Sequence, residues 1–119
     1  MSKLNLTETE YRFACIVWEN EPLGSGELVE LCNEELGWKK STTYTVLKRL
    51  CDRQIFKNVN ATVSAMVKKE QVQKFKSEKF INRTFNGSLP HFITSFMSDR
   101  KISQAEADKL KKLIDSYKG

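Results

Sequence analysis

Apolar residues recur at helical spacing along most of this chain, and the most informative stretch runs from residue 39 to residue 53. Within it Thr43, Val46, Leu47 and Leu50 stand at positions i, i+3, i+4 and i+7, which places them on one face of an α-helix. The opposite face carries hydroxyl groups and cations, namely Ser41, Thr42, Tyr44, Thr45, Lys48 and Arg49. Such groups are what a helix presents to DNA phosphates and base edges. An ordinary helix with a solvent-exposed basic face would show the same pattern. The rest of the sequence must therefore decide between a DNA-binding face and a solvent-exposed one.

Two shorter helices are predicted before this stretch. Thr7 and Glu10 form a capping-box pattern, so the first helix should begin after Thr7 and end near Asn20. Ser25 is expected to cap the second helix and Gly37 to end it. Three short helices, of which the second and third are joined by a brief glycine-containing turn, predict a helix-turn-helix.

After Arg53 the pattern changes from helical to strand-like. Residues 55–59 are rich in β-forming side chains, and residues 62–67 alternate between apolar and polar positions. Asn60-Ala61 between them fits a tight turn, because asparagine tolerates positive φ. A hairpin that follows a helix-turn-helix predicts a winged helix, with its second strand packed against the third helix.

Helical spacing returns near Lys69 and continues to the end of the chain, with Ser88 and Ser103 as candidate N-caps. The helices of this half are short but rich in large apolar side chains, which favours a dimerisation surface over packing against the first half. The candidate interface residues are Phe75, Ile81, Phe85, Phe92, Ile93, Phe96, Leu110, Leu113 and Ile114. The predicted fold is mainly α with a small β-hairpin. It comprises a winged helix-turn-helix DNA-binding domain over residues 1–68 and a three-helix dimerisation domain over residues 69–119.

Charge is distributed unevenly along the chain. The net charge is +5 and the sequence pI about 9.2. Residues 39–57 hold six cations and one anion, whereas residues 3–35 hold two cations and eight anions. A basic segment on the predicted third helix favours a polyanionic partner such as double-stranded DNA.

Other classes of protein find little support in the sequence. The three cysteines are odd in number and widely spaced, and one histidine cannot complete a zinc set, so we expect free thiols and no cofactor. No nucleophile–base set or glycine-rich phosphate loop is visible, so the chain is not expected to be an enzyme. The sequence shows no signal peptide and no apolar run long enough for a membrane span, so a cytoplasmic protein is expected.

The chain carries a series of short motifs, which are L-T-E-T-E-Y at 6–11, V-W-E at 17–19, G-W at 37–38, S-T-T-Y-T-V-L-K-R-L at 41–50, F-I-N-R-T-F-N-G-S-L at 80–89, F-I-T-S-F at 92–96 and I-S-Q-A-E at 102–106. Together they resemble the penicillinase-repressor family (BlaI/MecI, with a copper-responsive CopY branch) over about residues 4–118. The resemblance implies a winged-helix domain, a helical dimerisation domain and a homodimer that represses transcription from inverted-repeat operators. In the penicillinase branch, a membrane sensor-protease relieves repression by cutting the dimerisation domain.

The chain departs from the family pattern at four places. Lys39-Lys40 replaces a pair whose serine caps the third helix, so that cap passes to Ser41 or is absent. The wing segment, residues 60–65, contains no cation or aromatic residue, so the wing should add little DNA affinity. Ser95-Phe96 stands where the family is cut between Asn and Phe. The C-terminal Cys-x-Cys motifs of the copper-responsive branch are absent, so metal sensing is not expected.

We therefore expect a dimeric DNA-binding transcriptional repressor, related to β-lactamase repressors, that binds inverted-repeat operators through the helix at residues 39–53. A winged-helix module that binds protein without reading DNA is the alternative. The groove-facing candidates are Lys39, Ser41, Thr42, Tyr44 and Thr45, and the phosphate-facing candidates are Lys40, Lys48 and Arg49. For Arg49 an ion pair within the protein is the competing interpretation. Ser95 and Phe96 are the candidate cleavage pair for a sensor-protease.

Overall fold

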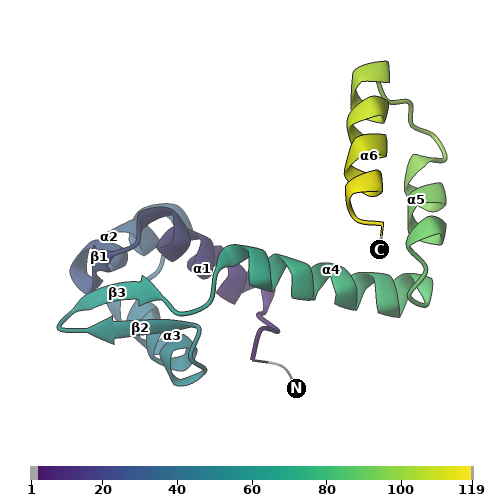
Figure 1. Cartoon of the computed structure of the whole chain (residues 1–119). Helices are drawn as coiled ribbons and strands as arrows, with labels where there is room; N and C mark the ends of the chain where they lie inside the picture. The colour runs from purple at the N-terminus through teal and green to yellow at the C-terminus, as the bar shows by residue number, and fades with distance from the viewer. Residues whose placement is uncertain (1–2, 119) are drawn as a thin grey trace. The chain divides into compact units, whose positions relative to one another are not determined.

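The structure is a computed structural model and describes residues 3–118. The chain divides into two compact units, the first ending at Lys79 and the second beginning at Phe80. Figure 1 shows the elements of both units. Helix α4 (Lys69–Phe85) runs from the first unit into the second. The domain boundary predicted between residues 68 and 69 falls at the first residue of this helix.

The first unit combines helices with a small antiparallel sheet. Its elements are α1 (Glu8–Asn20), β1 (Leu23–Gly24), α2 (Ser25–Leu36), α3 (Lys40–Asp52), β2 (Phe56–Val59), β3 (Thr62–Ala65) and the first part of α4. The strands lie in the order β1-β3-β2. The prediction of a mainly α fold with a helix-turn-helix and a wing is confirmed, and strand β1 is an addition that the sequence did not indicate.

Local signals set most of the helix ends. The capping box of α1 is present, because Glu10 N–H donates to Thr7 Oγ1 at 3.1 Å and Thr7 N–H donates to Glu10 Oε1 at 2.9 Å. Gly37, in the left-handed conformation at φ 69°, ends α2 as predicted. The expectation for Ser25 is wrong: Gly24 is the N-cap, and Ser25 is the first helical residue. The reason is tertiary, since Ser25 N–H donates to Ala61 O in the hairpin turn at 2.9 Å.

The wing is a two-residue hairpin. Asn60 and Ala61 both have positive φ, at 52° and 60°, as a tight hairpin turn requires. Val63 and Val67 are buried, which agrees with the predicted alternation. Strand β3 packs mainly on α1 and β2 mainly on α3, whereas the second strand was expected to pack on the third helix. The β1 strand accounts for the difference, because it extends the sheet beyond β3 at Leu23.

Helix α1 contributes several side chains to the core of the first unit. Phe13 is fully buried and stacks on Trp38 with ring centroids 5.7 Å apart. Trp18 contacts Phe56 edge to face and donates its indole N–H to Val67 O at 2.9 Å. These contacts join the helix-turn-helix and the wing into one core.

Glu10 carries a buried negative charge, with only 4% of its surface exposed. Arg49 Nε donates to Glu10 Oε2 at 2.9 Å, and Arg53 Nη1 lies 3.3 Å from Glu10 Oε1. Burial raises the pKa of Glu10, but the hydrogen bond from Thr7 and the two guanidinium groups outweigh it and hold this pKa below its ordinary value of 4.5. The ion pairs fix α3 against α1.

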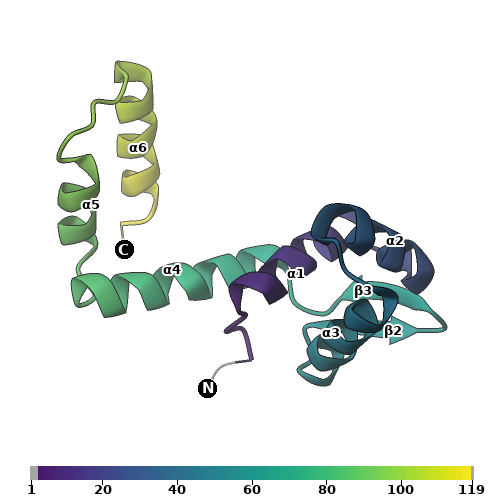
Figure 2. The ribbon, with the colours of Figure 1, turned by 180° about the vertical axis from the view of Figure 1, so that it is seen from behind.

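The second unit contains the end of α4 together with α5 (Leu89–Met97) and α6 (Gln104–Ser116). Ser88 and Ser103 cap α5 and α6 as predicted, through the N–H groups of His91 and Glu106. In both views α5 and α6 lie side by side (Figures 1 and 2). Neither helix has a buried residue in the single chain.

The Glu10 network can be tested by replacing its carboxylate with an amide. Glu10→Gln should lower the free energy of unfolding by about 1–3 kcal/mol at neutral pH, because it weakens charge-assisted hydrogen bonds to two arginines. The folded-state pKa lies below 4.5, so the carboxylate's contribution is complete above pH 4.5 and is lost as the pH falls through the folded value. The difference from wild type should therefore shrink in acid, as urea unfolding at several pH values would measure.

Glu8→Gln provides the matched control, because Glu8 is exposed in the first turn of the same helix. It should change the free energy of unfolding by no more than about 0.5 kcal/mol. A Glu10→Gln effect that stays constant from neutral to acid pH would contradict the assignment.

Candidate nucleic-acid interface

Helix α3 presents two different faces. Thr43, Val46, Leu47 and Leu50 are buried, as the spacing predicted. Seven of the eight candidate DNA contacts are exposed, namely Lys39, Lys40, Ser41, Thr42, Thr45, Lys48 and Arg49, and the eighth, Tyr44, is half-buried. They come from the N-cap and the first turns of the helix, the part that enters the major groove in helix-turn-helix proteins.

The amino end of α3 has no side-chain cap. Lys39 is the N-cap residue, and the helical hydrogen bonding begins with Thr43 N–H donating to Lys39 O at 3.1 Å. Of the two expectations for Lys39-Lys40, absence of a cap is therefore correct. An uncapped helix start leaves main-chain N–H groups and the positive end of the helix dipole available to an anion, and Lys39 and Lys40 add two charges there.

Tyr44 and Thr45 use their hydroxyl groups within the protein. The Tyr44 hydroxyl donates to Ser25 Oγ at 3.2 Å, and the Tyr44 side chain is half-buried between α3 and the start of α2. Thr45 Oγ1 donates to Ser41 O at 2.9 Å, although Thr45 itself remains exposed. Tyr44 therefore joins the two helices of the helix-turn-helix, while Thr45 keeps an acceptor oxygen at the surface.

The cations of α3 are not equivalent. Arg49 is paired with buried Glu10, so the competing interpretation of an ion pair within the protein is the one the structure contains. Lys48 lies 3.1 Å from Asp52, but both side chains are largely exposed. Exposed pairs of this kind contribute little stability and separate readily. Lys39 at the N-cap and Lys40 and Lys48 in α3 are thus exposed cations that no buried carboxylate holds.

The wing and the thiol groups add little chemistry to this surface. Lys57 is the single cation of the hairpin at residues 56–65, and it is exposed. The three cysteines are free, as predicted, and burial raises the pKa of Cys32 to about 11. Within residues 3–118 no group of His, Cys, Asp or Glu side chains could hold a metal ion. None of the helices described over that range has the length and apolarity needed to cross a membrane.

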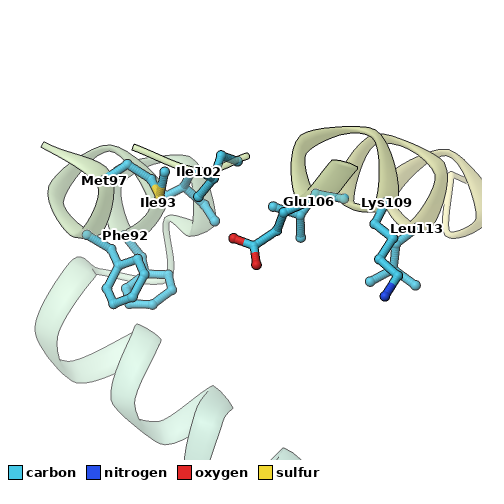
Figure 3. A pocket seen from close by; sticks show the side chains of 9 residues that line it. Phe92, Ile93, Met97, Ile102, Glu106, Lys109 and Leu113 are labelled. Carbon is cyan, nitrogen blue, oxygen red and sulfur yellow. The ribbon is translucent and has the colours of Figure 1, made fainter. Parts of the chain in front are cut away.

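A second candidate surface lies in the second unit, as an apolar groove of about 750 Å³ between α5 and α6 (Figure 3). Phe92, Ile93 and Met97 line it from α5, and Leu113 lies across the gap on α6 (Figure 3). The other lining residues are Phe96, Ile102, Glu106, Lys109 and Leu110. Five candidate dimer residues, Phe92, Ile93, Phe96, Leu110 and Leu113, therefore share this groove.

The remaining candidates of this half lie elsewhere. Ile81 and Phe85 are half-buried at the end of α4, where Phe85 contacts Phe92 edge to face. Ile114 is 60% exposed on α6, and Phe75 is half-buried in the first unit. Both residues of the candidate cleavage pair, Ser95 and Phe96, are exposed in α5.

Two residues that hold the interface in place were not found by sequence reasoning. Glu10 was recognised as half of a capping box, but not as the partner of two arginines of α3. Arg53 was counted only as a charge, yet its guanidinium donates to Glu10 and to two main-chain carbonyls of the chain start. The sequence holds one signal for this pairing. Glu10 lies on the same face of α1 as Ala14 and Val17, and that face is buried in the core.

These features define a winged-helix protein with a hydroxyl-rich, basic third helix and a separate helical unit. The chain belongs to the penicillinase repressor family, whose model matches residues 6–116. One relative, the penicillinase repressor of Bacillus licheniformis, is 19% identical over 117 residues, which cover 95% of this chain and 91% of that protein. Members of this family are transcriptional regulators and not enzymes, so the predictions of a repressor and of no enzymatic activity are confirmed.

Proposed function

We propose that this chain represses transcription as a homodimer that binds an inverted-repeat operator, with α3 of each protomer in the major groove. The observation that carries the proposal is the composition of the exposed start of α3, where Lys39 to Thr42 supply two cations and two hydroxyls on an uncapped helix end. In this proposal Ser41, Thr42 and Thr45 read base edges, while Lys39, Lys40 and Lys48 contact phosphates. Tyr44 and Arg49 act mainly by positioning α3, because the Tyr44 hydroxyl donates to Ser25 and Arg49 Nε donates to Glu10.

Dimerisation is proposed through the groove between α5 and α6. One chain leaves large apolar side chains of this unit exposed, with Leu113 at 54% and Phe96 at 51%. A second copy of the same unit would cover them in an isologous contact. When one DNA-binding unit of a dimer occupies its half-site, the other unit is held at a high effective concentration near the second half-site. The dimer therefore binds an inverted repeat far more tightly than two separate monomers do.

The DNA contacts predict how salt affects operator affinity. Lys40→Ala should weaken binding to all duplexes and reduce the slope of log K against log salt by about one unit for each phosphate that is no longer neutralised. Thr42→Ala should instead lower the ratio of specific to non-specific affinity, by roughly 5–100-fold. Fluorescence anisotropy on duplexes from the chain's own upstream region, at several salt concentrations, measures both effects.

Lys111→Ala is the matched control, because Lys111 is an exposed lysine of α6 in the other unit. It should leave the slope unchanged. A wild-type slope in Lys40→Ala would refute this orientation of α3, and wild-type protein without affinity for any duplex would favour a module that binds protein instead.

The groove predicts that one charge abolishes the dimer. Leu113→Asp should give a monomer at micromolar concentration where the native chain is a dimer, because a carboxylate buried in an apolar contact has no partner. The first unit should keep its fold, since Leu113 belongs to the second unit and is already more than half exposed in the single chain. Analytical ultracentrifugation measures the state, and operator affinity should fall by at least about 100-fold once the two half-site readers are no longer linked.

Lys111→Asp on the same helix introduces the same carboxylate outside the groove and should remain dimeric. A native chain that sediments as a monomer at these concentrations would overturn the dimer proposal.

Inactivation by proteolysis between Ser95 and Phe96 is the last part of the proposal. The pair is exposed in one chain but belongs to a helix, and its aromatic residue lines the groove, so cutting requires local opening and would remove half of the dimer contact. Co-expression with a penicillinase-type sensor-protease and its inducer should produce a fragment ending at Ser95, identified by mass spectrometry. Phe96→Asp should suppress that fragment, and an intact native chain under induction would eliminate the proteolytic switch while leaving repression in place.

A further inference from the structure

The segment Lys3–Thr7, here called the strap, precedes α1 and lies between other elements of the first unit. Leu6 is buried with 4% exposure, and Leu4 is half-buried against the same core. Leu6 N–H donates to Leu4 O at 3.0 Å, which folds the strap into a tight turn. Apolar anchoring and a main-chain hydrogen bond therefore give the strap a defined conformation.

Arg53 attaches the strap to the end of the recognition helix. Arg53 is the C-cap residue of α3, and its Nη2 donates to Lys3 O at 2.8 Å and to Asn5 O at 3.1 Å. The same guanidinium reaches Glu10 through Nη1, and only 28% of the Arg53 side chain is exposed. Charge-assisted bonds from one planar group fix the strap relative to α3.

Lys79 attaches the other side of the strap to α4. Its Nζ donates to Asn5 Oδ1 at 2.9 Å, and its side chain is half-buried. Val72 and Lys76 share this face of α4 at positions i and i+4, with Lys79 at i+7. Val72 is fully buried, and Lys76 Nζ lies 4.8 Å from the centre of the Tyr11 ring. Asn5 thus accepts from α3 through its main chain and from α4 through its side chain.

The position of the Lys79 contact gives it a special role. Lys79 is the last residue of the first unit, whereas α4 continues to Phe85 in the second unit. Among the hydrogen bonds described for residues 3–118, this one ties α4 to the first unit nearest to the residue at which the second unit begins.

We propose that the strap is a positioning element for operator reading, in which Asn5 and Lys79 restrict α4 and so select the spacing between the two half-sites. The inference rests on the proposed function, because it requires a dimer in which the second units associate and the two first units bind DNA. Half-sites must lie at a fixed distance along the duplex for both recognition helices to enter the groove, so any restriction on α4 becomes a restriction on that distance.

The experiment measures affinity against half-site spacing. The probes are inverted-repeat duplexes selected from a random library by the wild-type chain, rebuilt with one or two base pairs added to or removed from the spacer, and a duplex with a single half-site. The variants are Asn5→Ala, Lys79→Met and the two combined. Arg53 is not replaced, because its removal would leave the buried Glu10 carboxylate underpaired.

Wild type should prefer its selected spacing by roughly tenfold or more, since the linked half-site binds only where the geometry allows it. Both variants should lose about three- to tenfold in affinity at that spacing and flatten the preference, with half-site affinity within twofold of wild type. The double variant should lose no more than the larger single loss, because the same hydrogen bond between Lys79 and Asn5 is lost in each variant. Lys79→Arg should restore the preference.

Lys74→Met is the matched control, an exposed lysine of the same helix that loses the same charge. A spacing preference retained in Asn5→Ala and Lys79→Met would overturn the inference, as would an equal loss on the half-site and the full operator, which indicates a merely structural contact. A wild-type chain that binds selected duplexes without any preference for spacing would also overturn it. Failure of wild type to bind any duplex would reject the proposed function itself.

Discussion

The carboxylate of Glu10, buried between two arginines, is the interaction on which the position of the recognition helix depends. A buried charge is costly unless it is paired, so α1 and α3 cannot separate without leaving Glu10 or both arginines unsatisfied. The same carboxylate accepts from Thr7 N–H and so begins α1. One group therefore sets where the first helix starts, how the third helix lies against it and, through Arg53, where the chain start runs.

This arrangement divides the cations of α3 between two tasks. By sequence the basic segment holds six cations, of which Lys40, Lys48 and Arg49 were the candidates for phosphate contact. In the structure Arg49 and Arg53 neutralise Glu10, whereas Lys39 and Lys40 lie exposed at the helix start. The division follows from chemistry, because the guanidinium fork suits a fixed, partly buried carboxylate and the lysine ammonium suits a solvated, mobile contact.

Much of the fold could be predicted because its signals are local. The Thr7 capping box, the Gly37 helix end, the Asn60-Ala61 turn and the Ser88 cap each depend on a few neighbouring residues. The errors arose where distant residues decide: Ser25 is displaced from the cap by Ala61, and Glu10 meets an arginine 39 positions away. No periodicity encodes those pairings. The exposed face of α3 followed from spacing, but the engagement of Tyr44 and Arg49 depended on tertiary contacts.

The absence of buried side chains in α5 and α6 has a consequence for how the protein responds to its own abundance. In the proposed dimer, association covers apolar side chains that one chain leaves exposed in the second unit, so the stability of that unit would depend on the concentration of the chain. The first unit has its own core, so its stability would not depend on that concentration. The melting temperature of the second unit alone would then rise with the amount of chain present.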